Sequence, residues 1–286
     1  MNVMLGITLA ILSAVFWGVG GVIFKLGLRG ESELSGNLLR SIFAVLFLSP
    51  VILIKGIEPL TAELVALVIF SAFFAFFLGD FLYFRALKES AVSYALPLAS
   101  TYPVYVAILG LIVYGYPLTL NVVLASFLTV LAVVTIPKET GKFTFKSIIA
   151  VFAALSWSIS MVTLDYLTIY LSPVSLAFLR LVINSAMIYA VVREVKVSRN
   201  TLIFMGFLGG FISVAGILSF VTSVKLIGSN LVAPITASSP VIGSLAGKVL
   251  LKEKLSSRHV LALVFVFIAV IAISRPPVMI TPASEG

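Results

Sequence analysis

The chain has 286 residues, of which 61% are hydrophobic and only 10% are charged, and its formal net charge is +8. A soluble domain of this size carries about a quarter charged residues, so the composition excludes a water-soluble protein and predicts an integral membrane protein. The basic residues lie in short breaks between apolar runs, which disfavours a nucleic-acid partner. The absence of cysteine excludes disulfides, zinc–thiolate sites and thiol catalysis.

Apolar runs alternate with short polar breaks along almost the whole chain, and a helix needs about 20 apolar residues to cross the hydrocarbon layer. The runs predict an all-α membrane protein with ten transmembrane helices at 3–27, 37–54, 63–84, 91–114, 120–136, 147–170, 174–192, 201–224, 229–250 and 259–274. The longest polar break, PKETGKFTFK, lies near the middle of the chain. It predicts a first unit at 1–137, a connecting loop at 138–146, a second unit at 147–275 and a short tail at 276–286.

The two units resemble each other in sequence. At an offset of 140 residues, Trp17 corresponds to Trp157, Lys25 to Asp165 and Arg40 to Arg180, and at an offset of 137 the pair Pro97 and Pro103 corresponds to Pro234 and Pro240. Because each unit has an odd number of predicted helices, the second must enter the membrane in the opposite sense. The sequence therefore predicts an inverted repeat of five plus five helices.

Each proline pair interrupts an apolar run, ALPLASTYPV at 95–104 and VAPITASSPV at 232–241. Proline in a helix interior costs about 3 kcal/mol, and backbone groups freed within a bilayer are tolerated only where protein or a water-filled cavity satisfies them. Broken helices at a repeat interface are typical of transporter binding sites, although a simple packing kink is the alternative. The predicted substrate-binding residues are Trp17, Tyr94, Ser100, Thr101, Tyr102, Trp157, Thr236, Ser238 and Ser239.

Charged residues inside the predicted spans are costly and need a reason. The candidates for ion pairing or ion coupling are Lys25, Arg40, Asp80, Asp165 and Arg180. Comparable depth on consecutive helices predicts an Asp165–Arg180 pair, and Asp80 is expected to neutralise Arg40 or Lys25. Structural pairs near helix ends, or long side chains that reach the interface, are the alternative. A desolvated carboxylate such as Asp80 is also a candidate proton carrier.

Several stretches are similar to a known family. FWGVGGVIFKLGL at 16–28, Arg40 early in the second helix, YFRALKESAVSYALPLASTYPVYVAILG at 83–110 and LKEKLS at 251–256 resemble the EamA repeat of the drug/metabolite transporter superfamily. The resemblance covers both units and implies a ten-helix carrier that moves small metabolites, often outward, by alternating access. It places Lys25, Arg40, Glu253 and the prolines at recurrent family positions. The sequence departs from the pattern at Asp165, opposite Lys25, and at Tyr116, opposite Glu253.

The predicted function is therefore a carrier for a small metabolite, such as an amino acid, a nucleotide-related compound or a drug-like solute. A membrane enzyme or a receptor without transport activity is the alternative. The chain has one histidine, His259, and neither H-E-x-x-H nor a G-x-S-x-G in a suitable context, so an enzyme, a metal site and a cofactor are not predicted.

The surroundings of the protein are also expected from the sequence. Helices 120–136 and 259–274 are almost wholly apolar and are expected to face lipid or a second copy in a homodimer. Most loop Lys and Arg residues lie on the face of the first loop, and only Lys55, Lys225 and Arg275 lie on the face of the termini. The positive-inside rule then places both termini outside, whereas the resemblance implies termini inside. A multi-pass protein of the cell membrane is expected.

Overall fold

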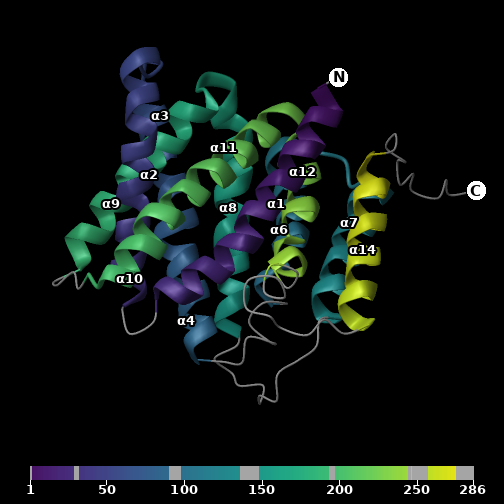
Figure 1. The fold of residues 1–286 in the computed structure, drawn as a ribbon. Helices are drawn as coiled ribbons and strands as arrows, with labels where there is room; N and C mark the ends of the chain where they lie inside the picture. Colours follow the sequence, from purple (N-terminus) through teal and green to yellow (C-terminus); the bar gives the residue numbers. More distant parts are fainter. Residues whose placement is uncertain are drawn as a thin grey trace, which may run out of the picture.

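The computed structural model describes residues 2–28, 32–89, 98–135, 148–192, 197–243, 246 and 257–274, and every regular element within them is a helix. Figure 1 shows these helices as one bundle, with α7 and α14 together along one side. Six helical segments of the described residues are long and apolar enough to cross a membrane, and three further apolar helices are shorter. The all-α prediction is therefore confirmed.

The predicted spans agree with the observed helices to within a few residues along most of the chain. The first unit contains α1 (Asn2–Gly27), α2 (Glu33–Lys55), a continuous rod of α3 (Ala62–Ala72), the π-helix η1 (Phe73–Gly79) and α4 (Asp80–Glu89), then α6 (Tyr102–Tyr114) and α7 (Leu120–Thr135). The second contains α8 (Ile149–Tyr170), α9 (Pro173–Val191), a rod of α10 (Arg199–Thr201), the π-helix η3 (Leu202–Leu208) and α11 (Gly209–Ile227), then α12 (Ser229–Thr236) and α14 (Ser257–Ser274).

Four helices begin at a serine or threonine whose hydroxyl oxygen accepts a hydrogen bond from a backbone N–H of the first turn. The capping residues are Ser32, Thr61, Ser172 and Ser198. Such caps satisfy an orphan donor of the helix and are worth about 1 kcal/mol each. The first and third stand 140 residues apart, and the second and fourth 137 apart, which are the two offsets of the sequence repeat. The same local signal thus starts equivalent helices in both units.

The two units interpenetrate rather than lying side by side. Helix α1 packs along α11 of the second unit, and α8 packs along the α3–η1–α4 rod of the first. Helix α2 packs against α9, α6 against α12 and α7 against α14, so every one of these contacts joins the two units. The space between α1 and α8 is consequently formed by both units.

Small and branched apolar side chains fill the interior, and large apolar side chains also cover the outside of the bundle. Leu164, Leu176 and Leu181 are fully buried, whereas Phe127 on α7 is 63% exposed and Phe267 on α14 is 67% exposed. An outer surface of this kind would be an aggregation hazard in water, but it suits a protein whose solvent is lipid. The exposed apolar residues therefore agree with a multi-pass membrane protein.

Both proline segments contain a turn between two helical pieces. The turns fall at Ser100–Thr101 and at Ala237–Ser238, again 137 residues apart. Pro103 occupies the first turn of α6, and Pro240 lies at the start of the helical piece 239–243. Proline is favoured at a helix start because its missing N–H would have had no partner there. The second proline of each pair therefore begins a helix, and the predicted continuous helices 91–114 and 229–250 are interrupted instead of kinked. Residues 90–97, with Pro97, lie outside the described part of the chain.

Candidate functional site

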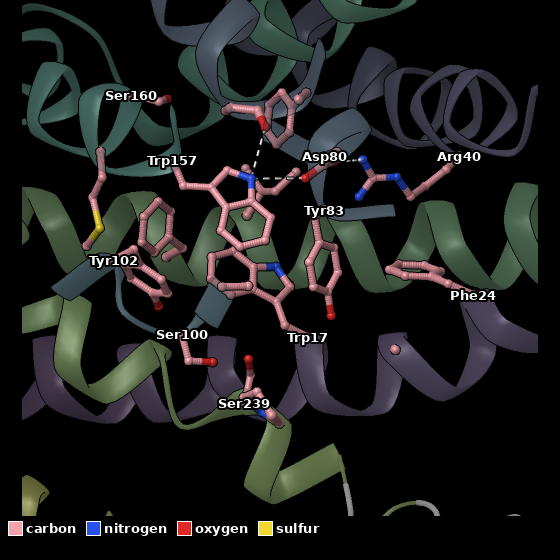
Figure 2. Close-up of a pocket in the computed structure, with 18 of the residues that line it drawn as sticks. Trp17, Phe24, Arg40, Asp80, Tyr83, Ser100, Tyr102, Trp157, Ser160 and Ser239 are labelled. Carbon is pink, nitrogen blue, oxygen red and sulfur yellow. Dashed lines mark hydrogen bonds and ion pairs between the residues drawn. The ribbon is translucent and has the colours of Figure 1, made fainter. Parts of the chain in front are cut away.

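A cavity of about 210 Å³ lies between α1, α8 and the two turns of the proline segments. It brings together residues of both units, and Figure 2 shows Trp17, Trp157, Tyr102, Ser100 and Ser239 around it. Its lining is Trp17, Gly21, Phe24, Arg40, Ala75, Phe76, Asp80, Tyr83, Ala99, Ser100, Tyr102, Trp157, Ser160, Met161, Arg180, Ile217, Phe220, Ser239 and Pro240. The lining is mostly apolar, with a few polar and charged groups, which is the usual character of a small-molecule site.

Residues that correspond in the sequence repeat meet in this cavity. Trp17 and Trp157 both line it, and so do Arg40 and Arg180. These four were singled out from sequence by the 140-residue offset alone. Their convergence places the cavity at the interface of the two units, as the sequence analysis expected for a site built by a repeat.

Arg40 and Asp80 form a buried ion pair at the edge of the cavity, with 2.7 Å between Arg40 Nη2 and Asp80 Oδ2. The same nitrogen donates to Asn37 Oδ1 at 2.6 Å, and the guanidinium carbon lies 5.5 Å from the centre of the Phe24 ring. The second carboxylate oxygen of Asp80 accepts a hydrogen bond of 3.2 Å from Trp157 Nε1, which Figure 2 shows as a dashed line. Of the two partners expected for Asp80, the structure thus pairs it with Arg40.

The π-helix η1 supplies backbone acceptors to this cluster. Its wider turn uses i→i+5 hydrogen bonds, and its carbonyl oxygens accept from side chains of other helices: Ser156 Oγ donates to Phe74 O at 2.6 Å, Trp157 Nε1 to Ala75 O at 3.1 Å and Asn37 Nδ2 to Phe76 O at 3.2 Å. The π-helix thereby fixes the Trp157 ring and presents Asp80 at its end. Single π turns occur frequently at functional sites.

Arg180 enters the cavity from α9 and has neutral partners. Its Nη2 donates to Ser160 Oγ at 2.8 Å, and its guanidinium carbon lies 4.7 Å from the centre of the Phe76 ring. Arg180 is only 2% exposed, and its Nε has no hydrogen-bond partner among the described residues. The predicted Asp165–Arg180 ion pair is therefore wrong.

Asp165 instead binds the beginning of α12. Its Oδ1 accepts from the backbone N–H of Ser229 at 2.8 Å, and its Oδ2 accepts from the Ser229 hydroxyl. A carboxylate is favoured at a helix N-terminus because it satisfies a free N–H and complements the helix dipole. Asp165 and Arg180 lie at similar depth, but their side chains point toward different helices.

This geometry predicts the outcome of a double-mutant cycle. We expect Asp165→Asn and Ser229→Ala to be coupled in thermal stability, because they break the same pair of hydrogen bonds, by about 1–2 kcal/mol. Asp165→Asn and Arg180→Gln should be additive within about 0.5 kcal/mol, because the two side chains share no partner. Rescue of Asp165→Arg by Arg180→Asp would contradict the observed arrangement.

The other predicted site residues lie elsewhere. The hydroxyls of Thr101, Thr236 and Ser238 donate to the backbone oxygens of Leu98, Val232 and Ile235, at 2.7, 3.0 and 2.5 Å, and none of the three residues lines the cavity. Thr236 Oγ1 also lies 2.7 Å from Tyr102 Oη, a contact that links the two proline segments. Tyr94 and Glu253 lie outside the described residues, as does the side chain of Lys25. Among the described residues, no group of three His, Cys, Asp or Glu side chains could hold a metal ion.

Sequence reasoning missed several lining residues: Phe24, Phe76, Tyr83, Ser160, Met161 and Phe220. Phe76 lies in the run FFAFFLG, where every position is apolar and no period indicates which side faces inward. Tyr83 and Phe220 are 137 residues apart, so the second repeat offset, applied to aromatic residues, would have paired them.

The chain is similar to proteins of one transporter family. The model of the EamA-like transporter family matches residues 4–136 and again 144–275. An uncharacterized transporter of Archaeoglobus fulgidus is 32% identical over 279 residues, which are 96% of this chain and 99% of that one. One protein crystal structure superposes with a TM-score of 0.78 over 95% of each chain at 16% identity. That likeness shows the fold alone.

Proposed function

Because the chain belongs to the EamA-like transporter family, we propose that this membrane transporter is a carrier that moves a small metabolite by alternating access through the cavity between its units. The observation that carries the proposal is the meeting of Trp17 with Trp157 and of Arg40 with Arg180 in one cavity. A site built from equivalent residues of two units can be opened toward either side by equivalent movements. Outward transport is the direction that the family resemblance favours.

The proposed architecture is ten transmembrane helices in an inverted repeat. Three features support it: the helix caps, the turns of the proline segments and the packing between units all recur at the repeat offsets. In addition, the beginning of α1 and the end of α14 lie at the same end of the bundle (Figure 1), which requires an even number of crossings. With five helices per unit, the second unit would run opposite to the first.

The proposed binding residues are the predicted ones that line the cavity: Trp17, Ser100, Tyr102, Trp157 and Ser239, with Arg40, Asp80 and Arg180 as its charged groups. Trp17 and Trp157 would form walls, and the hydroxyls would give hydrogen bonds. Thr101, Thr236 and Ser238 would hold the backbone of the turns in place. The cell membrane is the proposed location, and a homodimer through the exposed apolar faces of α7 and α14 is the proposed assembly.

Single cysteines test the carrier mechanism without a known substrate, because the chain has no native cysteine. We expect Ser239→Cys, in sealed vesicles of one orientation, to react with a membrane-impermeant thiol reagent supplied from outside and equally when the reagent is trapped inside. An alternating carrier exposes its central site to each side in turn. Phe127→Cys, on the outer face of α7, is the matched control and should react from neither side.

A receptor or an enzyme with a fixed opening would give a different result. In that case Ser239→Cys would react from one side only, and its rate from the other side would equal that of Phe127→Cys. This outcome would overturn the carrier mechanism, whatever the substrate.

A further inference from the structure

The charges that line the cavity do not balance. Among the described lining residues there are two guanidinium groups, Arg40 and Arg180, and one carboxylate, Asp80. The Asp80 carboxylate is bound to Arg40 at 2.7 Å, and its other oxygen already accepts from Trp157. Arg40 and Asp80 therefore neutralise each other, and Arg180 keeps its charge without an ion-pair partner among the described residues.

Arg180 has less compensation than a buried cation normally needs. Taking an ion out of water costs several kcal/mol even after the protein relaxes, and Arg180 is 2% exposed. Its compensation consists of one hydrogen bond to the neutral Ser160 Oγ and the face of the Phe76 ring. A guanidinium has five N–H donors in a fixed fork, and the Nε of Arg180 is buried without an acceptor. The cavity thus holds a cation whose donors are incompletely satisfied.

We infer that the substrate is a small organic monoanion whose carboxylate binds Arg180 and whose apolar body lies between Trp17 and Trp157. This inference rests on the proposed function. Guanidinium matches a carboxylate with two parallel, charge-assisted hydrogen bonds, which are about twice as strong as neutral ones. A bound carboxylate would make the loaded cavity neutral.

The rest of the cavity indicates the remainder of the molecule. Its volume of about 210 Å³ is below the roughly 300–1,000 Å³ of pockets for drug-sized ligands, so the body is about the size of one aromatic ring. The lining offers aromatic and aliphatic surface at Trp17, Trp157 and Met161, against which such a ring can pack. A substrate ammonium group finds no equivalent partner, since Asp80 is already bound on both oxygens. A monoanion is therefore favoured over a zwitterion or a cation.

The two tryptophans make binding directly observable. The chain has only two, and both line the cavity, so intrinsic tryptophan fluorescence of the purified protein reports on ligands there. The probes share one benzyl body and differ in charge: phenylacetate, phenylacetamide, 2-phenylethylamine and phenylglycine. We expect phenylacetate to change the fluorescence with a Kd at least about tenfold lower than that of phenylacetamide, and the amine and the zwitterion to bind no better than the amide.

Arg180→Gln tests the role of the guanidinium, with Arg199→Gln as the matched control because Arg199 is an exposed cation at the start of α10. Arg180→Gln should reduce the preference for phenylacetate over phenylacetamide to less than about threefold, and Arg199→Gln should keep it. Equal binding of the four probes to the unaltered protein would overturn the inference even if Arg180→Gln does not fold.

Each further outcome also decides the inference. Preferred binding of phenylethylamine, or of phenylglycine, would replace the monoanion by a cation or a zwitterion. Absence of a fluorescence change with all four would exclude a single-ring carboxylate from this cavity. In each of these cases, labelling of Ser239→Cys from both sides would leave the carrier mechanism intact, so the two proposals fail separately.

Discussion

Asp80→Asn is expected to lower the free energy of unfolding by about 3–5 kcal/mol, the range found when one partner of a buried ion pair is removed. The Asp80 and Arg40 side chains are 14% and 8% exposed, so water cannot replace the lost carboxylate. The substitution leaves the Arg40 charge in an apolar setting next to Arg180, which repels it. Thermal unfolding in detergent, followed by circular dichroism, measures the loss.

Two variants make this expectation specific. The double variant Arg40→Met with Asp80→Asn removes both charges and should regain at least half of the stability lost in the single variant, because no unpaired charge is left at that site. Glu63→Gln is the control for a lost acid on the same rod, since Glu63 is exposed and accepts a 3.0 Å hydrogen bond from Tyr166 at the surface. It should change stability by less than about 0.5 kcal/mol. If Asp80→Asn were as mild as Glu63→Gln, the ion pair would contribute nothing to the folded state.

Helix positions could be predicted from sequence because the membrane imposes a simple rule. Backbone groups in hydrocarbon must be satisfied within the helix, so apolar length and polar breaks were sufficient to place α1, α2, α8 and α9. The start signals at Ser32 and Ser172 are local as well. The repeat then identified Trp17 and Trp157 as a pair, because duplication leaves the same residue type at equivalent positions.

Side-chain direction could not be predicted in the same way. Asp165 and Arg180 lie at similar depth on neighbouring helices, but pairing also requires that both helices turn those positions toward each other. That rotation depends on tertiary packing, which brings the beginning of α12 to Asp165 and Phe76 to Arg180. The hydrophobic residues around each span give little guidance, since a helix in lipid is apolar on its outer as well as its inner side.

Polar residues near a proline were interpreted too readily as ligands. Thr101 and Ser238 stand beside turns in which the helical hydrogen bonds are interrupted, and their hydroxyls donate to nearby carbonyl oxygens. Serine and threonine compete for local backbone partners in this way wherever the regular ladder is broken. Ser100 and Ser239, one residue away in each turn, line the cavity instead. The sequence could mark the segment but not which hydroxyl faces the cavity.

The contact between α1 and the second proline segment leads to the other large effect. Gly18 lies where these backbones meet: a Cβ atom at this position would be 2.7 Å from Ser239 O and 2.8 Å from Gly243 N. Gly243 faces the same contact, since its own Cβ would be 3.0 Å from Gly18 O. Distances this short to backbone atoms cannot be relieved by a side-chain rotation. The helical piece 239–243 can sit beside Trp17 only because both positions are glycine.

We therefore expect Gly18→Ala to destabilise the protein by about 1–3 kcal/mol through overpacking, and to move Ser239 away from the cavity. Gly21→Ala, one turn further along α1, is the matched control, because a Cβ there would meet nothing within 4 Å. Alanine is favoured over glycine within a helix by about 0.5–1 kcal/mol, so Gly21→Ala should be neutral or slightly stabilising. Thermal unfolding separates the two variants, and the labelling rate of Ser239→Cys, combined with each of them, reports the position of the turn. An equal rate and an equal melting temperature in both would show that the close approach of α1 to the proline segment does not hold the cavity in shape.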